Sequence, residues 1–192
     1  MGDVNLKCQC GKVEGIAKHI NPKQGTRVVC YCNSCQKFAQ FLQPDGAGIL
    51  DNNGGTDIYQ TAPADVQFTK GTEHIKGIRL SPKGPHRWYA DCCKTPIGNT
   101  ASLKFPFVGL IHNFIDGSES AQQTLGPVRS KVHLDGAYGQ LPQPQSKLIS
   151  QNRYTLKFIL KMLSWKFSQK GKTSPFYQAN GKRVYPLETL NK

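Results

Sequence analysis

The sequence predicts a mainly β fold of antiparallel sheets, followed by a helical extension at the C-terminal end. Three observations lead to this prediction. The chain has 192 residues, 38% of them hydrophobic and 19% charged, which suits one globular domain with an extension. Its first hundred residues consist mostly of short apolar segments separated by Gly, Pro and Asp turn signals. The longest amphipathic pattern comes late, between residues 150 and 171.

The expected strands follow one another at short intervals, which favours antiparallel sheet over parallel βαβ units. They are bounded by turn signals and contain Val, Ile, Thr and aromatic residues. Their ranges are 11–20, 26–32, 55–61, 65–71, 73–81 and 86–92. These strands define a predicted domain over residues 1–112.

One helix is expected inside this domain, beginning at Asn33. Asn is a favourable N-cap residue. Phe38, Phe41 and Leu42 then recur at helical spacing. The helix therefore begins inside a cluster of cysteines.

Residues 113–192 form the predicted extension. The segment 116–127 is expected to be a loop and the segment 136–147 a connector, because the second is rich in Gly, Pro and Gln. A helix near 150–170 follows. One face of it carries Leu156, Ile159, Leu160, Leu163 and Phe167, and a second strip carries Phe158, Met162 and Trp165. Two apolar strips predict a helix that packs on the domain on more than one side; a basic amphipathic helix at a membrane surface is the alternative.

The charge and the termini narrow the function classes. A net charge of +13 and a pI near 9.5 favour anionic partners, such as nucleic acid, acidic lipid head groups or a small anionic substrate. The longest apolar stretch is interrupted by lysines and is too short to span a bilayer. The first residues contain no hydrophobic signal core, so a cytoplasmic location is expected. Motifs of serine hydrolases, phosphate loops and dinucleotide sites are absent from the sequence.

The cysteines are the main chemical signal. There are seven of them, and all lie in the first half of the chain. An odd number, tight clustering and the lack of a signal peptide argue against a disulfide framework. Thiols clustered in this way are more often metal ligands or a redox pair.

The cysteine spacing divides the set into four and three. Side chains two apart on a strand face the same way, so the C-x-C pairs Cys8/Cys10 and Cys30/Cys32 can each reach one ion. Cys35 adds a third thiol from the helix start, and adjacent cysteines at 92 and 93 need a tight turn to share a metal. The groups are Cys8, Cys10, Cys92 and Cys93, and Cys30, Cys32 and Cys35. Zinc suits both, with the first site closed and structural and the second open at its fourth position.

The segments "CQCGKVEG", "CYCNSCQKFAQ" and "CCKTPIGN" resemble, in order, three motifs of the glutathione-dependent formaldehyde-activating enzyme family. The resemblance covers about residues 6–100 and suggests a divergent branch of this superfamily, which also includes centromere-protein-V-like chains. It implies a β-tent fold, a structural zinc held by the first and last motifs, and a second zinc held by the middle one. Family members are carbon–sulfur lyases that join formaldehyde to glutathione.

The last motif departs from the family pattern. Where the family has the first cysteine of C-x-x-C, this chain has Ala90, so Cys92 is the best candidate for the fourth structural ligand. Lys94 stands where the family has Gly. Near this motif, His86, Arg87 and Lys94 could offset the negative charge of three thiolates, but they are expected to be plain surface residues. Trp88 and Tyr89 are expected to pack in the core rather than to line a pocket.

Three functions remain open from the sequence. The first is a carbon–sulfur lyase in which Cys30, Cys32 and Cys35 are the catalytic residues, hold a labile zinc and bind a small anionic thiol such as glutathione. The second is a non-enzymatic zinc module for a protein partner, with nucleic acid possible but less favoured. The third is a metal-free redox centre formed by the same three cysteines.

Overall fold

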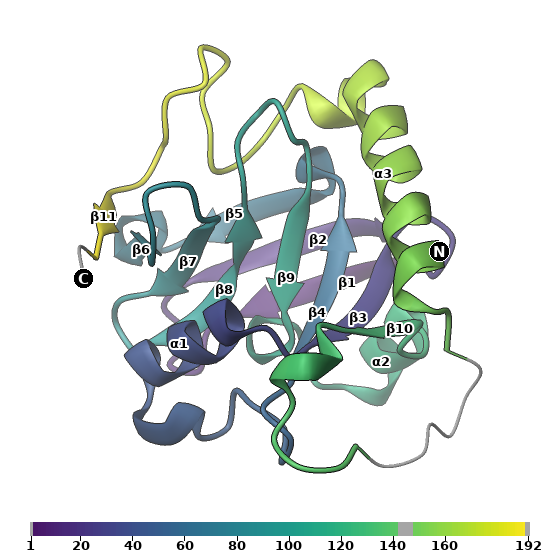
Figure 1. Cartoon of the computed structure of the whole chain (residues 1–192). Helices are drawn as coiled ribbons and strands as arrows, with labels where there is room; N and C mark the ends of the chain where they lie inside the picture. Colours follow the sequence, from purple (N-terminus) through teal and green to yellow (C-terminus); the bar gives the residue numbers. More distant parts are fainter. Residues whose placement is uncertain (1, 142–147, 191–192) are drawn as a thin grey trace.

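The computed structural model describes residues 2–141 and 148–190. Within those residues the strands form two sheets, drawn in Figure 1. The small sheet contains, in spatial order, β1 (Gly2–Lys7), β2 (Glu14–Ile20) and β5 (Val66–Lys70). The large sheet contains, in spatial order, β10 (Ser130–Val132), β3 (Thr26–Cys30), β4 (Thr56–Thr61), β9 (Val108–Ile111), β8 (Thr95–Thr100), β7 (His86–Ala90), β6 (Ile75–Arg79) and β11 (Leu187–Thr189). The prediction of a mainly β fold is therefore confirmed.

The C-terminal part of the chain contributes to the large sheet. All strand pairs are antiparallel in the described residues except β10 with β3 and β11 with β6. Both parallel strands come from residues after 113 and lie at the two edges of the sheet. They lie outside the predicted strand ranges, as do β1, β8 and β9.

Two hydrophobic clusters lie on opposite faces of the large sheet. One joins residues of both sheets, including Leu6 and Trp88. The other joins the large sheet to α1 (Asn33–Leu42) and includes Phe38 and Tyr89. Adjacent residues on β7 thus enter different clusters, as alternation along a strand requires. Trp88 and Tyr89 are both buried, as predicted.

A short helix, α2 (Glu119–Leu125), lies in the segment 116–127, which we expected to be a loop. Ser118 caps it by accepting a hydrogen bond from the backbone N–H of Ala121 at 3.3 Å. Ala121 and Leu125 are its only buried residues. Two apolar positions four apart are too weak a pattern to predict a helix from sequence.

The last helix, α3 (Gln151–Phe167), packs on one side only, not on more than one side as expected. Tyr154 and Trp165 are its buried residues, whereas Leu160 is 58% exposed and Phe167 84% exposed. The Tyr154 hydroxyl donates to Gln60 Oε1 at 2.6 Å, and the Phe158 ring contacts those of Tyr154 and Phe107. Aromatic contacts therefore fix the docked side. The predicted strip that contains Phe158 and Trp165 packs on the domain, whereas the leucine-rich strip, which we also expected to pack, is exposed.

The rest of the extension lies against the first cluster. The Phe176 ring stacks on Trp88 with centroids 5.1 Å apart, and Tyr177 is also buried. The connector predicted over 136–147 lies partly outside the described residues. Among the helices described, none has both the length and the apolar character needed to cross a lipid bilayer.

Candidate metal centres

The structure gathers the seven cysteines, all free thiols, into two clusters. Within each cluster the sulfurs lie within 4.8 Å of one another, so each could hold a metal ion. The members are Cys8, Cys10, Cys92 and Cys93 in the four-cysteine cluster, and Cys30, Cys32 and Cys35 in the three-cysteine cluster. These are the groups that the spacing predicted.

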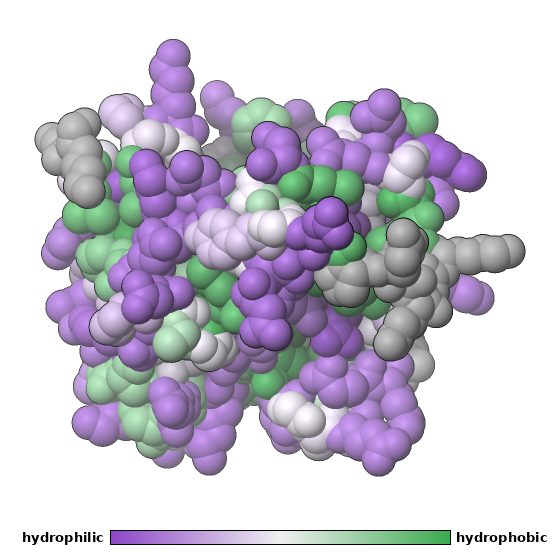
Figure 2. All heavy atoms as spheres, turned by 60° about the horizontal axis from the view of Figure 1, so that its bottom comes forward, coloured by the Kyte–Doolittle hydropathy of each residue, from purple (hydrophilic) through white to green (hydrophobic). Residues whose placement is uncertain are grey.

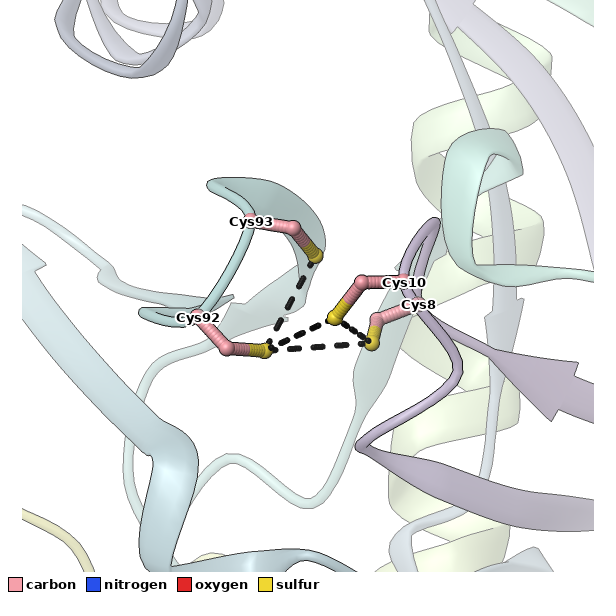
Figure 3. Close-up of side chains that lie close together, drawn as sticks. All are labelled: Cys8, Cys10, Cys92 and Cys93. Carbon is pink, nitrogen blue, oxygen red and sulfur yellow. Dashed lines mark hydrogen bonds between the residues drawn. The ribbon is translucent and has the colours of Figure 1, made fainter.

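The four-cysteine cluster is built from two turns (Figure 3). In the turn after β1, the Cys8 carbonyl accepts a hydrogen bond from the Gly11 N–H, and Gly11 has φ of 74°. The second turn joins β7 to β8 and brings the adjacent Cys92 and Cys93 to one side. Lys94 follows with φ of 57°, a left-handed conformation that favours glycine. The tight turn needed for adjacent cysteines to share an ion is present.

The sulfur separations match a tetrahedral thiolate site. Cys8 Sγ lies 3.6 Å from Cys10 Sγ, and Cys92 Sγ lies 4.0, 3.4 and 3.8 Å from those of Cys8, Cys10 and Cys93. With zinc about 2.3 Å from each sulfur, the edge of the tetrahedron is about 3.8 Å. A disulfide would need sulfurs about 2.05 Å apart. The geometry therefore fits a shared ion better than a disulfide.

Ala90 stands where the motif that the segment "CCKTPIGN" resembles has a cysteine. It is buried inside β7 and contributes no ligand atom. Cys92 is the fourth member instead. Cys8 is buried and Cys10 exposed, so this cluster lies at the surface, between the small sheet and the β7–β8 turn.

The thiols of this cluster differ in acidity. Burial raises the pKa of Cys8 and of Cys92, and neighbouring thiols raise both further. For Cys93 burial opposes ionisation, but hydrogen bonds from Thr95 and from the backbone of Cys10 and Thr95 lower the pKa to about 6. Thr95 Oγ1 lies 3.1 Å from Cys93 Sγ and accepts from the Gln9 N–H at 3.0 Å. A bound cation would lower the pKa of the other thiols, because it favours their ionised form.

The three-cysteine cluster lies where β3 passes into α1. Cys30 ends the strand, and Cys32 is the N-cap residue, so the expectation that Asn33 caps the helix is wrong. The Cys32 sulfur accepts a hydrogen bond from the Cys35 N–H at 3.4 Å. A thiolate at the cap satisfies a free helix N–H and also meets the positive end of the helix dipole.

This cluster is largely buried. Cys30 is 8% exposed and Cys35 5%, while Cys32 is partly exposed and forms the link to the surface. Among the described residues no His, Asp, Glu or further Cys joins the three. Hydrogen bonds with the other two thiols lower the pKa of Cys32 most, and the Cys35 N–H and Arg87 act in the same direction.

Arg87 is the residue of this site that the sequence interpretation misplaced. Its side chain is not at the surface but 3% exposed. Its guanidinium donates to Asn99 Oδ1 at 2.9 Å, to Ser34 Oγ at 2.7 Å and to Cys35 Sγ at 3.7 Å. No carboxylate in the described part of the chain forms an ion pair with it. A basic residue directly before the aromatic pair Trp88 and Tyr89 in a predicted strand was the signal that could have indicated its burial, though not its contact with Cys35.

A buried cation is costly unless an anion accompanies it. The sulfur of Cys35 is the neighbour of Arg87 that can carry negative charge. Hydrogen bonding with Cys30 and the charge of Arg87 favour the Cys35 thiolate, but hydrogen bonding with Cys32 and burial outweigh them and raise the pKa of Cys35. A bound cation would complete the ionisation, and Arg87 would then balance the negative charge.

His86 is also buried, contrary to the expectation of a surface residue, but it belongs to neither cluster. Its ring contacts Arg79 and hydrogen-bonds the Tyr177 hydroxyl at 2.6 Å through Nδ1. Burial, with the charges of Arg79 and Arg183, lowers the pKa of His86 to about 4. The imidazole is thus neutral and structural. Lys94 is exposed, as expected.

A polar cavity of about 430 Å³ lies beside the four-cysteine cluster and is lined by Gln9, Gln43, Ala47, Gly48, Ile49, Lys94, Thr95, Pro96 and Asn113. Gln43 is at the C-terminal end of α1, about 15 Å along the helix from the three-cysteine cluster. This cavity is therefore separate from the three-cysteine cluster and does not serve the open fourth position expected there.

Comparisons with known proteins add a family and a distant structural neighbour. A family model described as a family of unknown function (DUF6151) matches residues 1–188. No curated protein matches the chain. The chain is similar to the crystal structure of a Rhodobacter sphaeroides protein, a Northeast Structural Genomics target, at 16% identity and a TM-score of 0.44. The match covers 65% of this chain and 96% of that one.

Proposed function

The chain belongs to the DUF6151 family of unknown function, and we propose that it is a zinc protein with one structural and one thiol-activating site. In this proposal the four-cysteine cluster holds the structural ion. The three-cysteine cluster holds a second, more labile ion and is the catalytic site. The reaction is that of a carbon–sulfur lyase acting on the adduct of a thiol and an aldehyde.

The observation that carries the proposal is the burial of Arg87 against Cys35. Zinc with three thiolates has one net negative charge, and the guanidinium would cancel it. Neutrality matters for an anionic substrate, because a negatively charged site would repel it. The same cancellation would restore some of the Lewis acidity that three thiolates remove from the metal.

The chemistry proposed needs a thiol and a carbonyl in contact. Zinc with an open fourth position would bind the substrate thiol and lower its pKa. The thiol sulfur forms a bond to the aldehyde carbon, the carbonyl electron pair moves to oxygen, and the thiol proton ends there. The reverse sequence is the lyase direction. Cys32, as the partly exposed member, marks the side from which the substrate enters.

A small anionic thiol such as glutathione is the proposed substrate. The motif resemblance supports this choice, and a net charge of +13 would aid recruitment of an anion. A cytoplasmic location, where such thiols are abundant and reduced, fits the proposal.

The test is Cys32→Ala in the full-length protein. We expect zinc content to fall from two ions per chain to one and thiol–aldehyde adduct formation to be lost, with little change in melting temperature. A mild chelator should likewise remove one ion from the wild type while the circular dichroism spectrum is retained. Full adduct formation by Cys32→Ala, or a wild type with two zinc ions and no activity on any thiol–aldehyde pair, would refute the catalytic part.

One observation favours the alternative of a non-enzymatic zinc module. Cys30 and Cys35 are both buried, and the cavities described here are lined by other residues. A closed second site would serve as scaffold, and the basic surface would contact a protein or nucleic acid. Binding of nucleic acid with a steep salt dependence would support this alternative.

A further inference from the structure

The exposed side of α3 is unusually apolar. Leu156, Leu160 and Phe167 are 60%, 58% and 84% exposed, and Ile159 and Leu163 are each 44% exposed. These five residues, here called the apolar stripe, lie roughly opposite the buried Tyr154 and Trp165, since residues two apart on a helix differ by about 200°. By contrast, the face in Figure 2 is mostly hydrophilic, with hydrophobic residues in small groups. Joined apolar patches of this kind mark interaction surfaces.

A basic cavity adjoins the apolar stripe. It has a volume of about 450 Å³ and lies between α3 and the start of β3. Lys23, Arg129, Lys157 and Lys161 supply its charge, and none of the described residues that line it is acidic. Leu160 belongs to both the cavity and the stripe. The two features therefore form one continuous surface.

The cations of this surface have few anionic partners. None of the four forms an ion pair with a carboxylate within the described ranges, and Lys161 Nζ bonds only to Gly25 O at 2.9 Å and Thr26 Oγ1 at 3.1 Å. Between Asp135 and Glu188 the sequence has nine basic residues and no acidic ones. The charge of the surface is thus available to a ligand.

We propose that this surface docks the protein onto an anionic lipid membrane. The apolar stripe would enter the boundary between headgroups and acyl chains, as amphipathic helices with basic flanks do. The basic cavity would receive lipid headgroup phosphates, and each cation near the surface would add to the attraction. Docking of this kind is peripheral and needs no spanning helix.

Charge and chemistry favour this occupant over the others. A second copy of the chain would place two basic cavities against each other. A nucleic acid would satisfy the cations but leave four large aliphatic side chains against a polar backbone. An anionic bilayer offers both an apolar layer and a negative surface, and an interfacial helix buries its apolar face by about 5–10 Å between them.

The experiment is co-sedimentation of the full-length, zinc-loaded protein with vesicles. Vesicles of equal parts phosphatidylcholine and phosphatidylserine should bind the protein, and vesicles of phosphatidylcholine alone should bind it much more weakly. Added salt should weaken the binding. The double variant Arg129→Gln/Lys157→Gln should bind about 25-fold more weakly, since each removed charge is worth about fivefold.

The apolar stripe is tested by Leu156→Gln/Leu163→Gln, which should weaken vesicle binding by about tenfold or more. The melting temperature of this double variant should equal that of the wild type, because both leucine side chains are exposed. The matched controls are Lys12→Gln/Lys37→Gln, which removes two exposed lysines elsewhere, and Leu134→Gln, which removes an exposed leucine elsewhere. Both should bind like the wild type.

Three results would overturn the proposal. They are no binding to the anionic vesicles, equal losses in the controls and the test variants, and a dimer in sedimentation velocity that Leu156→Gln/Leu163→Gln abolishes. Because none of these readouts involves adduct formation, the membrane proposal can fail while the proposed enzyme function stands, and the reverse.

Discussion

Both cysteine clusters bring thiols close enough to share a metal ion, but they do so in different surroundings. The four-cysteine cluster is at the surface, joins two turns from different sheets, and includes the exposed Cys10. The three-cysteine cluster is beneath α1, comes from one continuous segment, and has Arg87 beside it. Zinc with four thiolates would carry two negative charges, which water at the surface can solvate. Zinc with three would carry one, which the buried site balances with a guanidinium.

In the proposed function, this difference separates a structural zinc site from a reactive one. The four-cysteine cluster connects residues 82–85 positions apart in sequence, counted from Cys10 to Cys92 and from Cys8 to Cys93, so its ion would hold the small sheet to the large one. The three-cysteine cluster spans only residues 30–35, which the helix and strand already hold together. Loss of its ion should therefore affect chemistry more than folding.

The largest effect expected is on folding. Cys8→Ser or Cys93→Ser should leave insoluble or unfolded protein, because the binding energy of a structural zinc ion is folding energy. The measurement is the soluble fraction after expression, followed by circular dichroism and zinc content. Cys32→Ala serves as the matched control and should remain soluble. A folded Cys8→Ser/Cys93→Ser double variant without zinc would show that the four-cysteine cluster is not a structural zinc site.

The next effect concerns the charge balance of the buried site. Arg87→Met should lower the free energy of unfolding of the zinc-loaded protein by about 3–5 kcal/mol, because it leaves a buried anion without its partner. In protein stripped by a mild chelator the cost should be much smaller, since neutral thiols need no counter-charge. Urea unfolding of both forms gives the comparison.

Arg87→Lys controls for charge alone. It keeps the cation but cannot reach Asn99, Ser34 and Cys35 at once, so it should recover part of the lost stability. An equal cost of Arg87→Met with and without metal would mean that Arg87 is a packing residue only.

Local spacing explains why the cysteine groups could be predicted from sequence. Cys30 ends β3, Cys32 follows two residues later in extended conformation as the N-cap of α1, and one helical turn returns Cys35 to them. The position of Arg87 depends on tertiary structure instead: β7 is four strands from β3 in the large sheet, and only the way α1 crosses the sheet brings it to Cys35. No local pattern contains that information.

The docked side of α3 was unpredictable for a related reason. Both of its strips are apolar, so hydrophobic spacing could not rank them. Which strip docks depends on contacts with the domain: Gln60 accepts a hydrogen bond from Tyr154, and the Phe107 ring packs against Phe158. The β fold itself was predictable because turn signals and strand lengths are local, whereas the edge strands β10 and β11 are too short to show a pattern.

A smaller effect should follow from the hydrogen bond to Cys93. Thr95→Val removes a buried hydroxyl next to the sulfur and should weaken zinc binding at the four-cysteine cluster by about 10–100-fold. The pKa of Cys93 is about 6 in the folded protein, against an ordinary value of 9.0. The ionised thiol therefore contributes its full stabilisation above pH 9.0, and this stabilisation is lost as the pH falls through about 6. Thr95→Val should raise the pKa and release zinc at a higher pH. Zinc release followed with a colorimetric chelator during acid titration measures the shift.

The smallest effect is expected from the same substitution beside the other cluster. Thr56 lies opposite Cys30 in the β3–β4 pair, and its hydroxyl is buried without a hydrogen-bond partner. Thr56→Val keeps the shape and removes an unsatisfied polar group, so it should raise the free energy of unfolding by about 1 kcal/mol and leave the zinc affinity of both clusters unchanged. Urea unfolding and zinc titration provide the two readouts. If Thr56→Val weakened zinc binding as much as Thr95→Val, altered strand packing would explain both results. The hydrogen bond from Thr95 to Cys93 would then have no specific role in zinc binding.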